Sequence, residues 1–208
     1  RVVGGAHAEI REQPVAERTI EELEHIKNDF SEVMRVATNS NSLMERLKHT
    51  GILPKQIAKD HGVVGVAARA VGFCMDARVD FPYAAYDRYQ FDIPTEHAGD
   101  VHARLAVRVK EADVSFGILA RALKDLADAK GEIAGKKEPL KKSAYAVSSV
   151  VGWRGDIVYF VATDADGNIS RVDVRDPSFL NWTVLGYAGR GNMVPDFPLI
   201  NKSFNLSF

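Results

Sequence analysis

Hydrophobic residues recur every three or four positions along much of the chain up to residue 130, and every second position further on. The spacing between Pro14 and Arg35 predicts an amphipathic helix. Its predicted apolar face comprises Ile20, Leu23, Ile26, Phe30 and Val33. Residues 39–42 predict the cap of a second helix through Leu47, and a short third helix is expected to end at Asp60. Helical spacing returns from Asp100 to Lys130, which predicts the longest element, of about eight turns.

The alternation of apolar and other residues near the C-terminus predicts a small antiparallel sheet. Its strands are expected at residues 144–151, 156–163 and 169–175, with a hairpin turn at residues 164–168. A calcium-binding loop begins like this turn, but Ile169 and Arg175 stand where such a loop needs Gly and Glu, so we favour the hairpin. Asp176 and Pro177 predict the start of a final helix. This order predicts an α+β fold with a mainly helical body, and we expect residues 1–208 to form a single domain.

Two segments show neither the helical nor the strand spacing of hydrophobic residues. Residues 61–94 are rich in glycine, small residues and aromatic residues, which predicts irregular, partly buried structure. Residues 131–142 contain four lysines, which predicts a solvated loop.

Composition narrows the possible functions. Lys and Arg number 27 against 28 Asp and Glu, so the chain lacks the basic surplus of a dedicated nucleic-acid-binding protein. The single cysteine, Cys74, excludes an internal disulfide and a thiolate metal site within this chain, and its apolar neighbours predict a buried, inert thiol. No apolar run approaches the roughly 18 residues of a membrane-spanning helix. Neither end carries a signal peptide, and we expect a fragment of a longer chain.

Three polar segments are candidates for chemistry. Asp76 and Arg78 precede Tyr83, so this segment predicts either a guanidinium beside a tyrosine hydroxyl in a polar pocket or a structural ion pair. Arg154 lies between two predicted strands, where it is either aimed at a ligand or an exposed hairpin residue. Asp196 lies between a proline and a phenylalanine, and a carboxylate in so apolar a run must be paired or functional.

Taken in order, these segments resemble the C-terminal half of the large subunit shared by group 4 nickel-iron hydrogenases and the 49-kDa subunit of respiratory complex I. Residues 72–112 are similar to the family's G-x-x-x-D-x-R-x-x-x-P-Y stretch and to the Gly-Asp step and long helix that follow it. Residues 1–7 resemble a Gly-Gly-containing turn of the family. The order of these segments over the whole chain makes the resemblance specific.

The resemblance implies roles for individual residues. Arg154 in Gly-Trp-Arg-Gly matches the Arg of the hydrogenase motif Ala-Pro-Arg-Gly, although the two residues before it differ. Asp76 and Arg78 match the Asp-x-Arg of the 49-kDa chains, and the run RGNMVPDF places Asp196 on the family's Asp and Asn192 on its His. The catalytic residues implied are Arg78, Arg154 and Asp196, and the implied cofactor-binding residues are Asp76, Tyr83, Asn192 and Asn205.

The end of the chain departs from the hydrogenase pattern. Ser207 falls where the first C-terminal nickel-ligating cysteine is expected, while Asn205 and Leu206 replace Asp and Pro. A serine hydroxyl is a hard ligand and stays protonated near neutral pH, so it does not replace a bridging thiolate. We therefore expect no metal ligand in this fragment and no nickel-iron centre.

The resemblance implies a subunit of a membrane-associated, complex I-like oxidoreductase. The fragment itself is expected to bind no cofactor and to be inactive alone. A former nickel-iron cavity would serve a quinone, and an iron–sulfur cluster would lie in a partner subunit. Arginines would stabilise negative charge on the reduced acceptor, and the Asp196 carboxylate would relay protons. The expected partners are the iron–sulfur small subunit and membrane subunits, with no nucleic acid and no direct membrane span, peripherally on the cytoplasmic side of the inner membrane.

Two alternatives stay open. The chain could belong to a genuine group 4 nickel-iron hydrogenase whose missing ligands follow Phe208. It could also be a non-catalytic subunit that keeps the fold as an assembly platform, because a fold does not fix a function.

Overall fold

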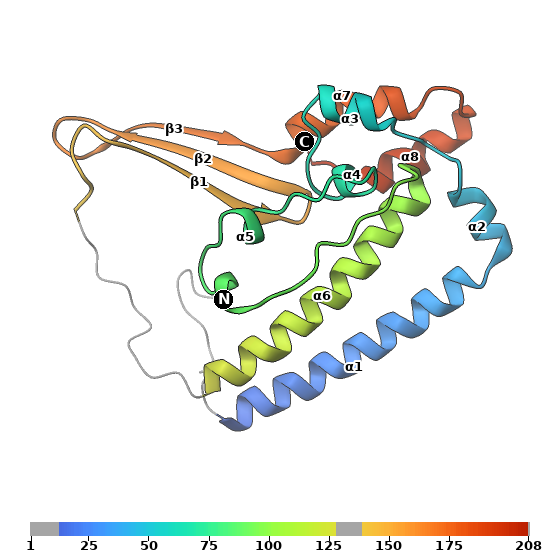
Figure 1. The fold of residues 1–208 in the computed structure, drawn as a ribbon, viewed down its shortest axis with the longest axis horizontal. Helices are drawn as coiled ribbons and strands as arrows, with labels where there is room; N and C mark the ends of the chain where they lie inside the picture. Colours follow the sequence, from blue (N-terminus) through green and yellow to red (C-terminus); the bar gives the residue numbers. More distant parts are fainter. Residues whose placement is uncertain (1–12, 128–138, 208) are drawn as a thin grey trace.

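The computed structural model describes residues 13–127 and 139–207 (Figure 1). Within these residues the elements follow in the order α1 (Gln13–Thr38), α2 (Asn41–Leu47), α3 (Lys55–Asp60), α4 (Gly65–Arg69), α5 (Ala77–Asp80), η1 (Tyr86–Arg88), α6 (Val101–Ala127), β1 (Tyr145–Gly152), β2 (Gly155–Thr163), β3 (Ile169–Arg175), α7 (Pro177–Ala188), η2 (Val194–Asp196) and α8 (Phe197–Phe204). A helical body with one small antiparallel sheet confirms the predicted α+β fold. The predicted turn at residues 1–7 and most of the predicted loop at 131–142 lie outside the described residues.

The two longest helices, α1 and α6, run antiparallel side by side (Figure 1). Phe30 of α1 packs against Phe116 of α6, with 6.4 Å between the ring centroids. Ile26 and Val33, which were predicted on the same apolar face, are 58% and 64% exposed. The apolar arc of α1 is therefore wider than the surface that α6 covers, and the periodicity alone did not show which part of the arc would be buried.

Side-chain caps fix the starts of two helices as predicted. The Ser40 hydroxyl accepts a hydrogen bond from the backbone N–H of Leu43 at 3.4 Å, which caps α2. The Asp176 carboxylate accepts one from the N–H of Ser178 at 2.7 Å, and Pro177 occupies the first turn of α7. Each cap satisfies a backbone donor that the helix itself leaves without a partner.

The predicted irregular segment contains the most deeply buried helix. All five residues of α4, Gly65–Arg69, are buried, and the core around them is formed with α6, α7 and α8. A helix that is buried on every side has no polar stripe, so the segment shows no helical period in the sequence. The irregular description was thus wrong for α4, although the expected burial of this part is confirmed.

The sheet is an antiparallel meander in the order β1-β2-β3. Its β1–β2 hairpin packs against the start of α4 (Figure 1), where a Cβ on Gly65 would lie 2.2 Å from the carbonyl oxygen of Arg154. Gly65 also has a φ of +66°, which favours glycine. The predicted turn between β2 and β3 is confirmed, because the Asp164 carboxylate accepts hydrogen bonds from the N–H groups of Asp166 and Asn168, each at 2.9 Å.

A fully buried arginine joins α6 to the C-terminal helices. The Arg104 guanidinium donates hydrogen bonds to the carbonyl oxygens of Gly99 and Gly51 at 2.7 and 2.9 Å, and to the Ser203 hydroxyl at 2.8 Å. It also lies 4.3 Å from the centroid of the Phe204 ring. Burial lowers the pKa of Arg104 to about 9. All these contacts hold chain segments together, so we assign this residue a structural role.

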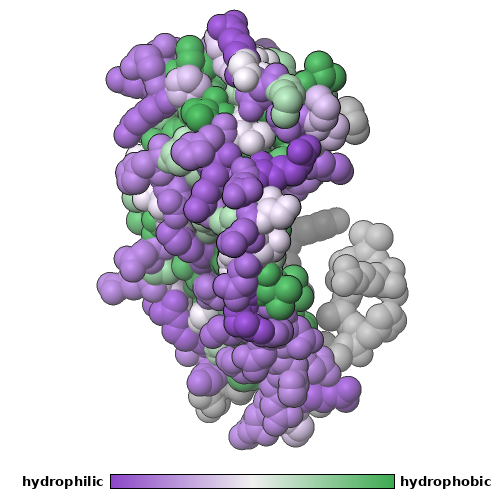
Figure 2. Space-filling view, turned by 90° about the vertical axis from the view of Figure 1, so that its right-hand side faces the viewer, coloured by the Kyte–Doolittle hydropathy of each residue, from purple (hydrophilic) through white to green (hydrophobic). Residues whose placement is uncertain are grey.

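The surface is mixed in character. On the face shown in Figure 2 hydrophilic side chains predominate, and hydrophobic ones show between them in small groups. In the described part of the chain, no helix has the length and apolar character needed to cross a membrane.

Candidate functional site

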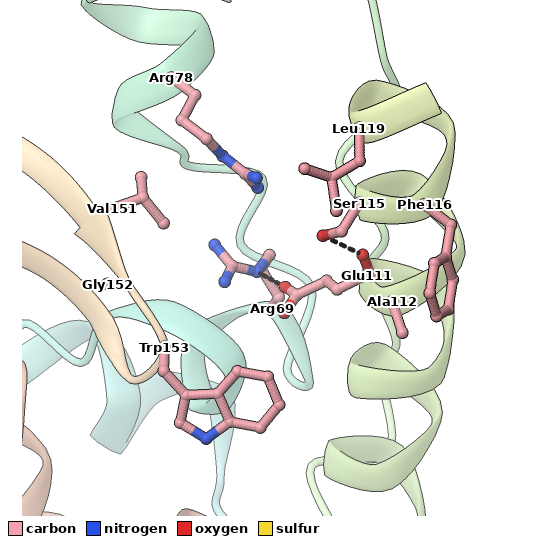
Figure 3. Close-up of a pocket in the computed structure, with 10 residues that line it drawn as sticks. All are labelled: Arg69, Arg78, Glu111, Ala112, Ser115, Phe116, Leu119, Val151, Gly152 and Trp153. Atoms are coloured by element: carbon pink, nitrogen blue, oxygen red, sulfur yellow. Dashed lines mark hydrogen bonds and ion pairs between the residues drawn. The ribbon is translucent and has the colours of Figure 1, made fainter. Parts of the chain in front are cut away.

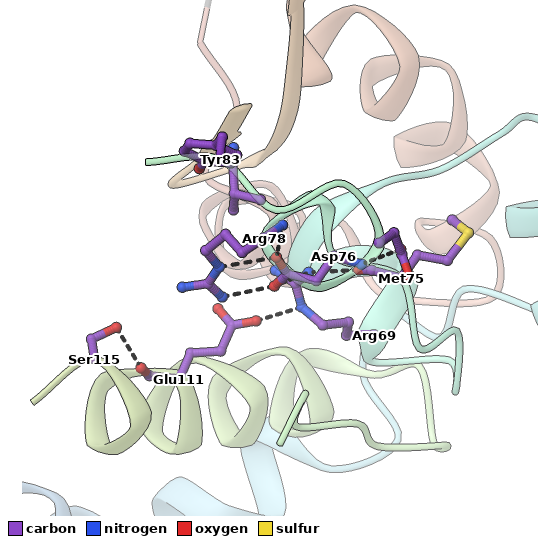
Figure 4. A network of polar contacts seen from close by, with 9 residues as sticks. Arg69, Met75, Asp76, Arg78, Tyr83, Glu111 and Ser115 are labelled. Atoms are coloured by element: carbon purple, nitrogen blue, oxygen red, sulfur yellow. Dashed lines mark hydrogen bonds and ion pairs between the residues drawn. The ribbon is translucent and has the colours of Figure 1, made fainter. Parts of the chain in front are cut away.

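Four charged side chains from three parts of the fold meet in the interior (Figure 4). We call Arg69, Asp76, Arg78 and Glu111 the arginine–carboxylate cluster. Arg69 is the last residue of α4, Asp76 and Arg78 lie at the start of α5, and Glu111 lies within α6. The ion-pair distances are 2.7 Å for Arg78 Nη2 to Asp76 Oδ2, 3.8 Å for Arg69 Nη1 to Asp76 Oδ2, and 2.5 Å for Arg69 Nε to Glu111 Oε1.

Local helix capping creates the pair of Asp76 and Arg78. The Asp76 carboxylate accepts hydrogen bonds from the backbone N–H and the Nε–H of Arg78, each at 2.9 Å. The Arg78 guanidinium also lies 4.8 Å from the centroid of the Phe91 ring, a cation–π distance. Of the two interpretations from the sequence, the ion pair is present.

Burial and charge move the pKa values of the two cluster carboxylates in opposite directions. Burial alone would raise the pKa of Asp76, but its hydrogen bonds from Arg78 and the positive charges of Arg78 and Arg69 outweigh burial and lower it. Burial raises the pKa of Glu111, and the positive charge of Arg69 offsets this only in part. Asp76 therefore stays ionised near neutral pH, while Glu111 accepts a proton more readily than an exposed glutamate.

The cluster forms one wall of a cavity of about 340 Å³ (Figure 3). The cavity is lined by Arg69, Arg78, Glu111, Ala112, Ser115, Phe116, Leu119, Val151, Gly152 and Trp153. The guanidinium groups of Arg69 and Arg78 lie between the β1–β2 hairpin on one side and α6 on the other, and both of these elements add apolar side chains to the lining (Figure 3). Such a combination suits a ligand with an apolar body and a polar or anionic group.

Tyr83 holds the wall of the cavity together. Its hydroxyl oxygen accepts a hydrogen bond from the backbone N–H of Val151 at 3.0 Å, which ties the segment after α5 to β1. Its ring packs edge-on against Tyr86, with 5.1 Å between the centroids. Its hydroxyl bonds to β1, so its visible role is to position the cavity wall.

A third carboxylate, Asp156 of β2, lies behind the cluster. Burial raises its pKa, the negative charge of Asp76 raises it further, and a hydrogen bond from the backbone N–H of Ala77 lowers it in part. The polar groups around Asp76 therefore extend from α4 and α5 to the sheet.

Arg154 lies outside the cavity that Arg78 lines. Its Nε–H donates a hydrogen bond to the carbonyl oxygen of Asn205, at the end of α8. Asn205 lines a second cavity of about 350 Å³, and Trp153 lines both cavities. The hairpin that carries Arg154 thus separates two hollows and fastens the last residues of the chain.

Asp196 and Asn192 make contacts within the C-terminal part of the fold. The Asp196 carboxylate accepts a hydrogen bond from the N–H of Met193 at 3.2 Å and lies 3.4 Å from the guanidinium of Arg46. The Asn192 side chain accepts one from the N–H of Gly51 at 3.0 Å. As the sequence required, the carboxylate in this apolar run is paired. Neither residue lines the cavity beside the cluster.

Sequence reasoning missed Arg69, Glu111 and Asp156. Arg69 carried a usable signal, because it is a charged residue within a run of small and apolar residues, the same argument that drew attention to Asp196. Glu111 and Asp156 carried no such signal, since their burial depends on how α6 and β2 pack against α4 and α5.

The cysteine prediction was wrong. Cys74 is exposed on the segment between α4 and α5, because its apolar neighbours do not enclose it. Among the described residues, no group of three His, Cys, Asp or Glu side chains lies close enough to hold a metal ion.

The residues at the expected nickel-ligand position do not fit nickel. The Ser207 hydroxyl lies 3.0 Å from the Ser178 hydroxyl, which also accepts a hydrogen bond from the N–H of Ser207 at 3.1 Å. The carbonyl oxygen of Ser207 accepts one from the Trp182 indole at 2.8 Å. A hydroxyl group that is hydrogen-bonded to Ser178 therefore stands at the position where the resemblance expects a thiolate.

The chain matches a known family of respiratory subunits. Residues 1–152 match the family described as the 49 kDa subunit of respiratory-chain NADH dehydrogenase. The chain belongs to this family, which confirms the resemblance drawn from its motifs.

Individual relatives agree with this assignment. The chain is 34% identical over 188 residues to an NADH-quinone oxidoreductase subunit of Herpetosiphon aurantiacus, covering 88% of this chain and 50% of the relative. It is 31% identical over 174 residues to the carbon monoxide-induced hydrogenase of Rhodospirillum rubrum, covering 84% and 48%. A solved structure of the membrane-bound sulfane sulfur reductase, an archaeal respiratory membrane complex, matches with a TM-score of 0.84 and 26% identity, over 94% of this chain and 54% of that one. The chain thus spans about half the length of the curated relatives it matches.

Proposed function

We propose that this chain is the C-terminal part of the large subunit of a membrane-associated, respiratory-type oxidoreductase. In this proposal the cavity beside the arginine–carboxylate cluster forms part of the site where an acceptor such as a quinone is reduced. Electrons would come from an iron–sulfur cluster held by a partner subunit. The subunit would dock peripherally, on the cytoplasmic side of the inner membrane, against that partner and membrane subunits.

One observation carries the proposal: in a chain of this family, two arginines line a cavity that aromatic and aliphatic side chains also line. Arg78 spends its Nε–H and one Nη group on Asp76, so the rest of its guanidinium can face a ligand (Figure 3). A fixed guanidinium stabilises negative charge that develops on an acceptor when it is reduced. Apolar lining residues such as Val151, Trp153 and Leu119 suit a planar ring such as that of a quinone.

The test uses the complex assembled with the full-length subunit. Replacing Arg78 with Met is expected to lower acceptor reduction by about 100-fold, the effect of removing one stabiliser of a developing anion. Arg88→Met is the matched control, because Arg88 is an exposed arginine on the same segment, and its rate is expected to equal the wild type. Size-exclusion chromatography of the complex confirms assembly, and Arg78→Lys tests whether a positive charge alone suffices.

Unchanged turnover in assembled Arg78→Met would overturn the acceptor site and favour the assembly platform. A genuine hydrogenase is tested separately by metal analysis of the same complex. We expect no stoichiometric nickel, because paired serine hydroxyls occupy the position of the C-terminal ligand. Stoichiometric nickel together with hydrogen turnover would contradict the quinone-type function.

A further inference from the structure

Carboxylates outnumber guanidinium groups around the cavity. Three carboxylates, those of Asp76, Glu111 and Asp156, share the neighbourhood of two guanidinium groups, those of Arg69 and Arg78. Two further arginines lie close enough to interact electrostatically with these carboxylates, but each has other contacts or is exposed to solvent. Arg108 on α6 directs its guanidinium to the carbonyl oxygens of Arg104 and Phe204, and Arg175 on β3 is exposed. One carboxylate too many is therefore held in a partly buried setting.

Asp76 takes most of the available positive charge. It receives the two side-chain hydrogen bonds of Arg78, at 2.9 and 2.7 Å, and Arg69 Nη1 lies 3.8 Å from it. Arg69 also donates a hydrogen bond to the carbonyl oxygen of Met75 at 3.2 Å. Of the two guanidinium groups, only Arg69 turns a nitrogen to Glu111, and this is the sole ion pair of Glu111 among the described residues.

The carboxylate of Glu111 has fewer polar partners than that of Asp76. Its Oε1 approaches Arg69 Nε to 2.5 Å, but the two atoms lack the alignment of a hydrogen bond. Among the described residues, these are the buried side-chain polar atoms without a hydrogen-bond partner. Burying an ionised carboxylate is costly, the ion pair with Arg69 offsets only part of that cost, and protonation relieves the rest.

Glu111 also has access to the cavity. Its side chain is 19% exposed, whereas that of Asp76 is 1% exposed. It lines the hollow of about 340 Å³ together with Ser115, one turn further along α6 (Figure 3). Water or a ligand in the cavity can therefore reach this carboxyl group, while Asp76 is sealed behind Arg78.

We propose that Glu111 is the group that exchanges protons with the ligand in this cavity, in place of Asp196. The inference rests on the proposed function. A quinone takes up two electrons, which the partner's iron–sulfur cluster supplies in the proposed function, and two protons. Glu111 in its acid form gives one proton to the reduced acceptor oxygen, and water in the cavity supplies the other. The resulting carboxylate lies beside Arg69, and water in the cavity returns the proton. The raised pKa of Glu111 supports this role, because it keeps part of the group protonated closer to neutral pH.

The first test needs no variant and no turnover. A hydrophobic carbodiimide modifies carboxyl groups in their protonated form, and peptide mass spectrometry of the treated complex locates the adduct. We expect modification at Glu111 at pH values where exposed glutamates, with a pKa of about 4.3, are ionised. We expect none at Asp113, an exposed carboxylate on the same helix. Absence of the adduct at Glu111 across the whole pH range would overturn the proposal.

The second test measures acceptor reduction by the assembled complex as a function of pH. Glu111→Gln keeps the shape but carries no exchangeable acid, and is expected to lower kcat by about 100-fold and to remove the decline in rate at high pH. Glu111→Asp should restore part of the rate, and Asp113→Asn should match the wild type. An unchanged pH profile in assembled Glu111→Gln would overturn the proton-exchange role. Failure of the proposed function looks different, because the wild-type complex itself would then not reduce the acceptor.

Discussion

The arginine–carboxylate cluster and the C-terminal residues 192–207 both carry polar side chains that the sequence made candidates, yet they use them differently. In the C-terminal region the polar groups of Asn192, Asp196 and Ser207 are occupied by contacts within the fold. In the cluster, Glu111 has a single ion pair, with Arg69, and both side chains line a cavity. A polar group whose hydrogen bonds are all made within the fold stabilises structure, whereas one with free hydrogen-bonding capacity beside a cavity is available to a ligand.

The largest effect is expected from removing the positive charge between the two carboxylates. Arg69→Met leaves Asp76 and Glu111 short of a buried partner, which is expected to lower the free energy of unfolding by about 3–5 kcal/mol. Arg18→Met is the control, because the Arg18 pair with Glu22 is exposed and is expected to contribute at most about 1 kcal/mol. Urea denaturation of the full-length protein measures both. Equal losses in the two variants would show that the buried ion pairs of Arg69 stabilise the protein no more than the exposed pair of Arg18 and Glu22.

The contact between the β1–β2 hairpin and α4 is tested by a glycine. Gly65→Ala forces a Cβ against the Arg154 carbonyl at a φ of +66°, and is expected to lower the free energy of unfolding by about 1–3 kcal/mol. Gly117→Ala on α6 meets nothing within 4 Å and is expected to stabilise the protein by about 0.5–1 kcal/mol. Thermal unfolding of the full-length protein distinguishes the two. A neutral Gly65→Ala would mean that the hairpin can move away from α4.

The contributions of Asp76 and Glu111 to the free energy of unfolding should change with pH in opposite directions. The pKa of Asp76 is lowered on folding, so its contribution to stability is present above its ordinary value of about 3.9 and is lost as the pH falls through the folded pKa. The pKa of Glu111 is raised, so its contribution is present below about 4.3 and is lost as the pH rises through the folded pKa.

Measuring the free energy of unfolding against pH for Asp76→Asn and Glu111→Gln tests these signs. The deficit of Asp76→Asn should shrink in acid. Glu111→Gln should gain on the wild type as the pH rises, because the amide stays neutral while the wild-type carboxyl must ionise in a buried site. Parallel pH curves for the two variants would contradict the assignment of separate roles.

The smallest effect is expected at Asp196. Asp196→Asn removes the ion pair with Arg46, whose side chain is 53% exposed, and keeps an oxygen that can accept the hydrogen bond from Met193. The free energy of unfolding should change by about 1 kcal/mol or less, and acceptor reduction by the complex should be unchanged. A large loss of turnover with normal stability would indicate that Asp196, and not Glu111, exchanges protons with the ligand. The C-terminal region would then be the functional one.

Residue patterns were sufficient to predict the elements whose signals are local. Periodicity located α1 and α6 and the three strands, side-chain oxygens located the starts of α2 and α7, and the two-residue spacing of Asp76 and Arg78 located their pair. Each of these depends on neighbours a few positions away, which a pattern of residue types records. The motif order also identified the family.

Which charged groups meet depends instead on the packing of distant segments. Arg69 and Glu111 come together because α4 packs against α6, and Asp196 is directed to Arg46 because η2 lies near α2. The same packing left Cys74 exposed and gave Ser207 a hydroxyl partner in Ser178. Burial and pairing arise from contacts between segments far apart in the chain, and these contacts determine whether a carboxylate keeps its proton.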